Sequence, residues 1–581
     1  MPVTPFPRPR SFSAAPGDGP APGAPVTVTI DPSLPGQGFR LVTSADGIAI
    51  SHADAAGLRY ALATLDQLRT GPDFGDVAYR VTDHPDFPVR GFVLDVSRDR
   101  VPTRRTLARW VQVLALARVN ALELYTEHTF AFSGHEEVWR DASPLTADDV
   151  RWLDGLCAAH GIELVCNQNT LGHMERWLRH EAYAQRAENE EGFTAWGRHH
   201  PPGTLEPTAD NADFVTGLLE EVVPLFRTRR VNIGADEPFE LGTGKSAGRV
   251  REEGLGGVYL EHVARVAGPW LERGYAVEFW ADVLGEHPEL TGRVPAGAVP
   301  VVWQYDSPSL TAAAGLRNGF RERAVLLRQA GAPFWVAPGA SNWNSLLGRF
   351  DNAVENMVDA AEVGLENSAR GYLNTSWGDG GHWDPPSVAF GPALFGGAVS
   401  WCLEANRDLD VAAVLDEHVL ADPTGTVGRV LVRTGRVCAD LGVPMLNASP
   451  LHRALQEADG LADPDVPTPE RLRGALDVLA RCREDLRTAD PACADGDVVV
   501  RELTQAIRLA ELAARYLLPR AEGADGPDPA TARALLAELD ALVQEQRACW
   551  LLRARPGGLD DSTARFTALR RALVRAGARE D

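Results

Sequence analysis

Lysine is almost missing from this chain of 581 residues, where Lys245 stands alone among 57 basic residues. Acidic residues number 80, which leaves a formal net charge of −23. Nucleic acids and anionic membranes both attract clustered basic side chains, so this balance argues against either partner. The chain also lacks a membrane-length apolar run and a signal-peptide core near Met1. We therefore expect a cytoplasmic protein.

Cysteine is scarce too, with seven residues and no CxxC pair. An odd, scattered set is typical of reduced thiols rather than of a disulfide framework or a zinc site. His180, His199 and His200 show no metal-ligand spacing with carboxylates, so we predict no metal and no cofactor. The segment Gly242–Ser246 resembles a phosphate loop, but Phe239 stands where the Walker spacing requires glycine.

The length allows two to four domains, and composition divides the chain into four segments. Residues 1–24 are rich in Pro, Gly and Ala and predict a disordered tail. Residues 25–85 predict a small α+β domain. Residues 86–407 alternate between short apolar runs and amphipathic helices, whereas residues 408–581 have helical spacing throughout. We interpret this last segment as a packing and oligomerisation domain, which allows a homo-oligomer.

The central segment contains eight candidate strands separated by helices. Such alternation predicts parallel βα units, and eight of them predict a (β/α)8 TIM barrel. A doubly wound open sheet is the alternative, but no glycine-rich dinucleotide turn follows the first strand. The candidate strands are Arg90–Val96, Ala121–Tyr125, Glu163–Gln168, Val231–Ile233, Ala276–Trp280, Val299–Trp303, Phe334–Val336 and Gly371–Thr375.

Two adjacent acids follow the fourth of these strands. Val231–Ile233 leads through Gly234 into Asp236 and Glu237, as a buried strand does when it delivers acids to a pocket. Like charges this close push their pKa values apart, so one acid can hold a proton while the other stays ionised. A solvated loop dipeptide is the alternative, and only the surrounding residues can decide between the two.

Charged, amide or aromatic residues follow nearly every other strand as well. In a TIM barrel these positions meet at one face, which we expect to be polar and lined with tryptophan. Apolar sugar faces stack on aromatic rings, and sugar hydroxyls need paired donors and acceptors, so this lining suits a carbohydrate. For any single tryptophan, a place in the barrel core is the alternative. Five of the 14 tryptophans stand here: Trp280, Trp303, Trp343, Trp377 and Trp383.

Residues 25–405 resemble the family 20 glycoside hydrolases, the β-N-acetylhexosaminidases. The order and spacing of several short motifs produce this resemblance, and no single motif is decisive. The motifs are Arg90-Gly91 with Leu94-Asp95-Val96-Ser97-Arg98, Gly172-His173, Gly234-Ala235-Asp236-Glu237 and Trp377-Gly378-Asp379.

The resemblance implies a retaining hydrolysis in which the 2-acetamido group of the substrate is the nucleophile, an exception to the two-carboxylate scheme. Glu237 would be the general acid and later the base. Asp236 would stay ionised and orient the acetamido group, whose oxygen attacks C1 to form an oxazolinium-like intermediate. His173 would lie near Glu237 and tune its protonation; a satisfied buried histidine is the alternative.

The same resemblance implies the residues that bind the sugar. Arg98 and Asp379 would hold ring hydroxyls. Glu127 stands where the family has the first of two acids after strand 2. The box around the acetamido methyl and the ring would consist of Trp280, Trp303 and Trp377.

Four positions depart from the family pattern. His128 stands where the family has the second acid after strand 2. Asn232 stands where the family has His, and Asn169 where it has Asp, which leaves His173 without its usual charged partner. The family tyrosine that donates to the acetamido carbonyl is replaced by the segment Ser341–Asn344, so an amide or indole N–H there, or Tyr305, would take its role. We expect a terminal GlcNAc or GalNAc as substrate. The alternatives are a glycosidase that acts on a sugar without the acetamido group and a non-catalytic carbohydrate-binding protein.

Overall fold

The predicted strands close into one parallel barrel in the computed structural model, which describes residues 4–98, 100–195, 198–458, 460, 462 and 465–578. The barrel strands are β6 (Val89–Asp95), β7 (Ala121–Thr126), β8 (Glu163–Gln168), β11 (Arg230–Asn232), β12 (Ala276–Trp280), β13 (Ala298–Trp303), β14 (Trp335–Ala337) and β15 (Gly371–Ser376). Each strand pairs with the next along the chain, and β15 pairs with β6 to close the ring. The predicted (β/α)8 barrel is confirmed, with strand bounds within one residue of those expected.

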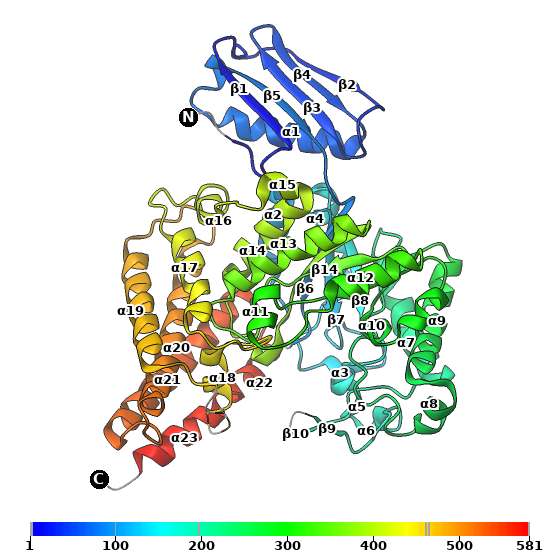
Figure 1. Cartoon of the computed structure of the whole chain (residues 1–581), viewed down its shortest axis with the longest axis vertical. Helices are drawn as coiled ribbons and strands as arrows, with labels where there is room; N and C mark the ends of the chain where they lie inside the picture. Colours follow the sequence, from blue (N-terminus) through cyan, green and yellow to red (C-terminus); the bar gives the residue numbers. More distant parts are fainter. Residues whose placement is uncertain are drawn as a thin grey trace.

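Helices outside the barrel return the chain from the end of one strand to the start of the next (Figure 1). Several begin at side-chain caps: the Thr103 hydroxyl accepts the N–H of Thr106, and Thr146 forms a capping box with Asp149. Because the crossovers keep all strands parallel, their carboxyl ends meet at one mouth. The longer helices are α2 (Arg104–Leu116), α4 (Ala147–Ala159), α7 (Ala209–Val222), α9 (Leu255–Glu272), α12 (Phe320–Gln329), α13 (Phe350–Glu366) and α14 (Phe390–Trp401).

A five-stranded sheet with α1 (Ala55–Arg69) precedes the barrel. Its strands, in spatial order, are β1 (Ser11–Pro16), β5 (Val77–Asp83), β3 (Phe39–Ser44), β4 (Gly47–His52) and β2 (Val26–Ile30). The predicted disordered tail over residues 1–24 is wrong for its described part, because β1 pairs antiparallel with β5 and Phe6 is 2% exposed. Composition could not reveal a strand whose partner lies much later in the chain.

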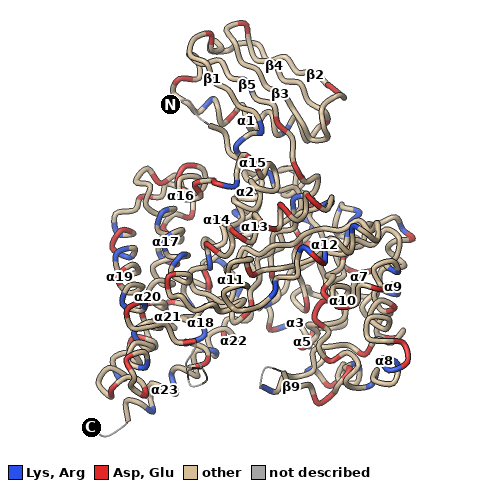
Figure 2. The backbone as a smooth tube through the Cα atoms, in the orientation of Figure 1, with Lys and Arg blue, Asp and Glu red and all other residues tan. Residues whose placement is uncertain are grey.

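Every element described after residue 408 is helical, in agreement with the prediction for residues 408–581. The apolar faces of these helices join the barrel core in one continuous cluster, so the region packs directly on the barrel (Figure 1). Acidic positions occur in the sheet, the barrel and the helices alike (Figure 2). Among the described residues, no helix is both long and apolar enough to cross a bilayer. The main helices are α17 (Val427–Asp440), α18 (Pro450–Gln456), α19 (Pro469–Asp485), α20 (Gly496–Ala521), α21 (Pro529–Arg553), α22 (Leu559–Ala564) and α23 (Thr567–Gly577).

Candidate active site

The two adjacent acids are delivered by a tight turn after β11. Gly234, Ala235 and Glu237 have φ angles of +66°, +66° and +45°, a region that residues other than glycine rarely adopt. The N–H of Ala235 donates to Asn169 Oδ1 at 3.1 Å, and the N–H of Glu237 donates to Asp282 Oδ2 at 3.0 Å. A Cβ at Gly234 would lie 2.9 Å from Asn169, so glycine is required there. These contacts hold a strained turn that aims both carboxylates at the mouth of the barrel.

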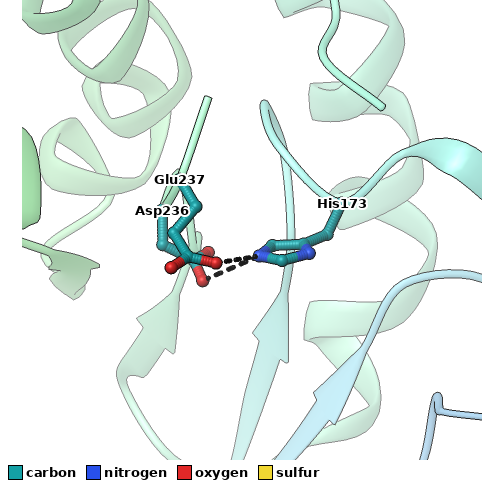
Figure 3. Close-up of side chains that lie close together, drawn as sticks. All are labelled: His173, Asp236 and Glu237. Atoms are coloured by element: carbon teal, nitrogen blue, oxygen red, sulfur yellow. Dashed lines mark ion pairs between the residues drawn. The ribbon is translucent and has the colours of Figure 1, made fainter. Parts of the chain in front are cut away.

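His173 joins the two carboxylates from the loop after β8 (Figure 3). Its Nε2 lies 3.3 Å from Asp236 Oδ2 and 3.4 Å from Glu237 Oε2. Burial opposes a charge here, but Asp236 and Glu237 raise the pKa of His173 well above its usual value. His173 thus has no acid at position 169, where its usual charged partner would stand, and Asp236 is its charged partner instead.

The two acids differ in exposure and in partners. The side chain of Asp236 is 12% exposed, and Asn169 Nδ2 donates to its Oδ1 at 2.7 Å. Burial acts to raise the pKa of Asp236, but the charge and hydrogen bond of His173 outweigh it and lower that pKa. The side chain of Glu237 is 35% exposed and lines a cavity of about 530 Å³ that Trp303 also lines. Asp236 is thus held ionised, while Glu237 faces open space.

Arg98 gathers three carboxylates at the same mouth. Its guanidinium lies 2.9 Å from Asp95 and 3.3 Å from Glu127. It also lies 3.5 Å from Asp379. Burial raises the pKa of Glu127 to about 7 against the charge of Arg98, and burial also raises the pKa of Asp379. The cluster therefore combines a fixed cation with acids that can accept or donate hydrogen bonds near neutral pH, as sugar hydroxyls require.

Sequence reasoning missed two residues of this site, Tyr125 and Asp282. The Tyr125 hydroxyl donates to Glu127 at 2.9 Å and accepts from Asn169 at 3.2 Å, which links the arginine cluster to the loop that contacts Asp236. Burial and the charge of Asp236 raise the pKa of Asp282 to about 7. Both residues stand at the carboxyl end of a barrel strand, and that position was the only signal available.

The aromatic residues predicted to wall a sugar pocket lie together. They are Trp280, Trp303, Tyr305, Trp343 and Trp377. Tyr305 stacks on Trp303 with centroids 5.0 Å apart and meets Trp343 edge-on at 5.2 Å. Trp377 meets Trp280 edge-on at 5.7 Å. The rings thus form one contiguous cluster in which Trp280, Trp343 and Trp377 are buried, whereas Trp303 lines the cavity beside Glu237.

Trp383 does not belong to this cluster. Its ring stacks on Phe566 at 3.9 Å, and its indole N–H donates to the carbonyl of Ser562 at 3.2 Å. The expectation that Trp383 faces the pocket is wrong, because the loop after β15 turns this side chain toward α22 and α23. That helical partner is distant in the sequence.

The donors proposed from the loop after β14 are already used within the protein. The amide of Asn342 donates to a backbone carbonyl and to a buried carboxylate. The indole N–H of Trp343 donates to Asn447 Oδ1 at 2.6 Å, and the Asn344 amide donates to the Asn447 carbonyl at 3.1 Å. The remaining predicted alternative is the Tyr305 hydroxyl, which has the side chains of Trp377 and Thr375 within hydrogen-bonding reach. Burial raises the pKa of Tyr305 well above its usual value, so the hydroxyl keeps its proton and can donate it to a hydrogen bond.

A metal ion and a phosphate group are two other ligands that residues of this barrel could bind. Within the described part of the chain, ligand atoms of His173, Asp236 and Glu237 lie within 4.8 Å of one another, close enough to share a metal ion. A protonated imidazole has no lone pair for a metal, so the raised pKa of His173 favours a proton in that position.

In the segment that resembles a phosphate loop, the N–H groups of Gly244 and Ser246 donate to an internal carboxylate at 3.0 Å, which occupies the place of a phosphate.

Comparison with known proteins places this site in a family. Residues 87–316 match the family described as "Glycosyl hydrolase family 20, catalytic domain". Hexosaminidase D of Bos taurus is 25% identical over 272 residues, covering 44% of this chain and 75% of its own length. A beta-hexosaminidase of Akkermansia muciniphila is 26% identical over 244 residues, covering 36% of this chain and 47% of its own length, so the chain spans about half of that relative.

A solved structure shares the fold. The beta-N-acetylhexosaminidase from Bacteroides fragilis superposes with a TM-score of 0.52 at 17% identity, over 68% of this chain and 90% of that one. The family match extends from β6 to β13 and includes Arg98, His173, Asp236 and Glu237. Residues 87–316 are therefore similar to the catalytic domain of glycoside hydrolase family 20, and the chain is identified as a glycoside hydrolase.

Proposed function

We propose that this enzyme removes terminal β-linked N-acetylhexosamine, GlcNAc or GalNAc, from the non-reducing end of a glycan or glycoside, with retention of configuration. One observation supports this most strongly. Asp236 and Glu237 converge on the same nitrogen of His173, at 3.3 and 3.4 Å, so both acids approach the substrate from one side. A two-carboxylate retaining enzyme needs its acids on opposite faces of the scissile bond. The nucleophile is then supplied by the substrate, as its 2-acetamido oxygen.

Glu237 acts as the general acid and then as the base. It protonates the glycosidic oxygen while the bond from C1 to that oxygen breaks. The acetamido oxygen bonds to C1 and forms an oxazolinium intermediate. Glu237 then takes a proton from water, whose oxygen adds to C1 and reopens the ring. The exposure of the Glu237 side chain to the cavity of about 530 Å³ supports this role, because leaving group and water both need access to it.

Asp236 orients the acetamido group and stabilises its developing positive charge. The donation from Asn169 and the contact with His173 keep this carboxylate ionised. Tyr305 donates to the acetamido carbonyl oxygen, in place of the amide and indole donors of the neighbouring loop. The preorganised charge of Asp236 stabilises the transition state more than the bound substrate, whereas the donation by Tyr305 is made in the bound substrate as well.

The remaining pocket residues select the sugar. Arg98, with Asp379 and Glu127 beside it, binds ring hydroxyls, since guanidinium and carboxylates present fixed donors and acceptors. The tryptophan walls stack against the apolar face of the ring and exclude water from C1.

Turnover of aryl β-GlcNAc, β-GalNAc and β-glucoside by the purified protein tests the proposal. We expect hydrolysis of at least one N-acetyl substrate, little of the glucoside, and competitive inhibition by a thiazoline mimic of the oxazoline. Glu237→Gln should lose about 10²–10⁴-fold in kcat/KM, and less with a dinitrophenyl leaving group that needs no protonation. The exposed Glu289→Gln is the matched control. Failure of both N-acetyl substrates, or equal turnover of the glucoside, would contradict the proposal.

A further inference from the structure

The helical C-terminal region reaches into the loops that carry the sugar pocket. Asn447 lies between α17 and α18 and has φ +51°, a left-handed conformation that asparagine tolerates better than most residues. Its N–H donates to Asp306 Oδ1 at 3.0 Å, and its carbonyl accepts from Asn344 Nδ2 at 3.1 Å. These backbone contacts fix Asn447 against the loops that follow β13 and β14.

The side chain of Asn447 holds the indole of Trp343. Its Oδ1 accepts the indole N–H at 2.6 Å and is also approached by Arg349 at 3.5 Å. The opposite edge of the indole lies against Gly339, where an added Cβ would stand 2.5 Å from Trp343 Cη2. The ring is fully buried, at 0% exposure. Trp343 is therefore clamped between a glycine on one edge and an acceptor oxygen on the other.

The clamp extends from Trp343 to the substrate side of the pocket. Trp343 meets the Tyr305 ring edge-on, at 5.2 Å and 85°, and Tyr305 stacks on Trp303 at 5.0 Å and 18°. Tyr305 also lies 6.3 Å from Trp377. A shift of the Trp343 indole would remove the support of the Tyr305 ring, because close-packed aromatic contacts transmit displacement.

We propose that Asn447 is a positioning residue of the sugar pocket, and that its side-chain oxygen sets the orientation of Trp343 and, through it, of Tyr305. The inference rests on the proposed function, which places Tyr305 at the acetamido group. It assigns the helical region a share in the active site, where sequence reasoning had found only packing.

The neighbouring pocket loop is held from the same region. Gln456 of α18 donates to the carbonyl of Gly380, and Ser562 of α22 donates to the carbonyl of Gly381 at 2.5 Å. These carbonyls directly follow Asp379, which contacts Arg98. Contacts from α18, α22 and the Asn447 turn thus secure the loops after both β14 and β15.

Asn447→Gly is the decisive variant, because glycine keeps the left-handed backbone and removes only the acceptor. Ala421→Gly is the matched control: it has φ +49°, lies in the same region and is not part of the pocket. We expect Asn447→Gly to raise KM for the aryl N-acetyl substrate about three- to tenfold, the loss of one neutral hydrogen bond, with kcat within about twofold of wild type. Asn447→Asp, which keeps an acceptor for the indole, should restore KM to within about threefold of wild type.

The kinetic pattern separates positioning from loss of folded protein. A merely destabilised enzyme has fewer active molecules, so its apparent kcat falls while KM stays constant. A fall in the apparent kcat of Asn447→Gly at constant KM would overturn the inference. So would an unchanged KM in Asn447→Gly, or a KM of Asn447→Asp that stays as high as that of Asn447→Gly.

A failure of the proposed function would look different. Wild type would then turn over neither N-acetyl substrate. In that case the near-ultraviolet circular dichroism of Asn447→Gly, compared with Ala421→Gly, still reports whether the buried Trp343 has moved. An unchanged spectrum would again overturn the inference.

Discussion

Removing the side-chain amide of Asn169 should move the acid limb of the pH–activity profile toward higher pH. Asn169 Nδ2 donates at 2.7 Å to Asp236 Oδ1, and the side chain of Asp236 is 12% exposed. The donor stabilises the ionised form of this acid, so its loss favours the protonated form, which cannot orient the acetamido group. A hydrogen bond to a buried charged group contributes about 1.5–3 kcal/mol. For Asn169→Ala this corresponds to a displacement of the acid limb by about one to two pH units.

The measurement is kcat/KM for the aryl N-acetyl substrate across the acid and neutral range. At pH values above the acid limb, the kcat/KM of Asn169→Ala should be closer to that of wild type than it is at pH values below the limb. Asn167→Ala is the matched control, because that amide lies on β8, two residues before Asn169, and donates to Glu123 at 2.9 Å instead of to Asp236. An acid limb that superimposes on that of wild type, or an equal displacement in the control, would refute the assigned role.

Three further outcomes are expected. Arg98→Lys keeps the charge but loses the planar fork that lies 2.9 Å from Asp95 and 3.3 Å from Glu127, so kcat/KM should fall by about tenfold or more in steady-state assays; an unchanged value would contradict this. Asp282 has a pKa of about 7, raised from its usual range, so its stabilising contribution is complete at low pH and is lost as pH rises through about 7. In Asp282→Asn the amide oxygen can still accept the Glu237 N–H. The Tm of this variant minus the Tm of wild type should therefore increase from about pH 5 to about pH 8, and a Tm difference that stays constant over this range would contradict the reasoning. Phe566→Ala should lower the free energy of unfolding by about 3–5 kcal/mol in urea titrations, because Phe566 is 2% exposed and stacks on Trp383; a loss below about 1 kcal/mol would mean that the stacking is not formed.

The barrel could be predicted because its signal is local. Each strand is a short apolar run followed by a helix, and parallel βα units have few ways to pack. The strand bounds therefore agree with the structure to within one residue. The N-terminal strand Ser11–Pro16 escaped prediction because its partner, Val77–Asp83, lies far along the chain. Composition describes a segment by itself and does not contain the hydrogen bonds that a distant edge provides.

The site residues likewise divide into those that their position in the sequence could select and those that it could not. Position after a strand was enough to select Asp236, Glu237 and the pocket tryptophans as candidates, because all carboxyl ends of a parallel barrel meet at one face. The role expected of Arg98 followed from the resemblance to family 20. Position alone could not decide between Trp343, which faces the pocket cluster, and Trp383, which packs on Phe566. Both follow strands and look alike in the sequence.

The sequence by itself determined the barrel, the paired acids and the polar mouth, since these depend on residue type and spacing along one stretch of chain. Only the tertiary structure decided the state and the direction of the side chains. The pKa of His173 is raised because two acids from another loop lie within 3.4 Å of its Nε2. Trp343 is oriented because Asn447, about a hundred residues later, accepts its N–H. Such effects depend on distances between segments remote in sequence, and those distances exist only after folding.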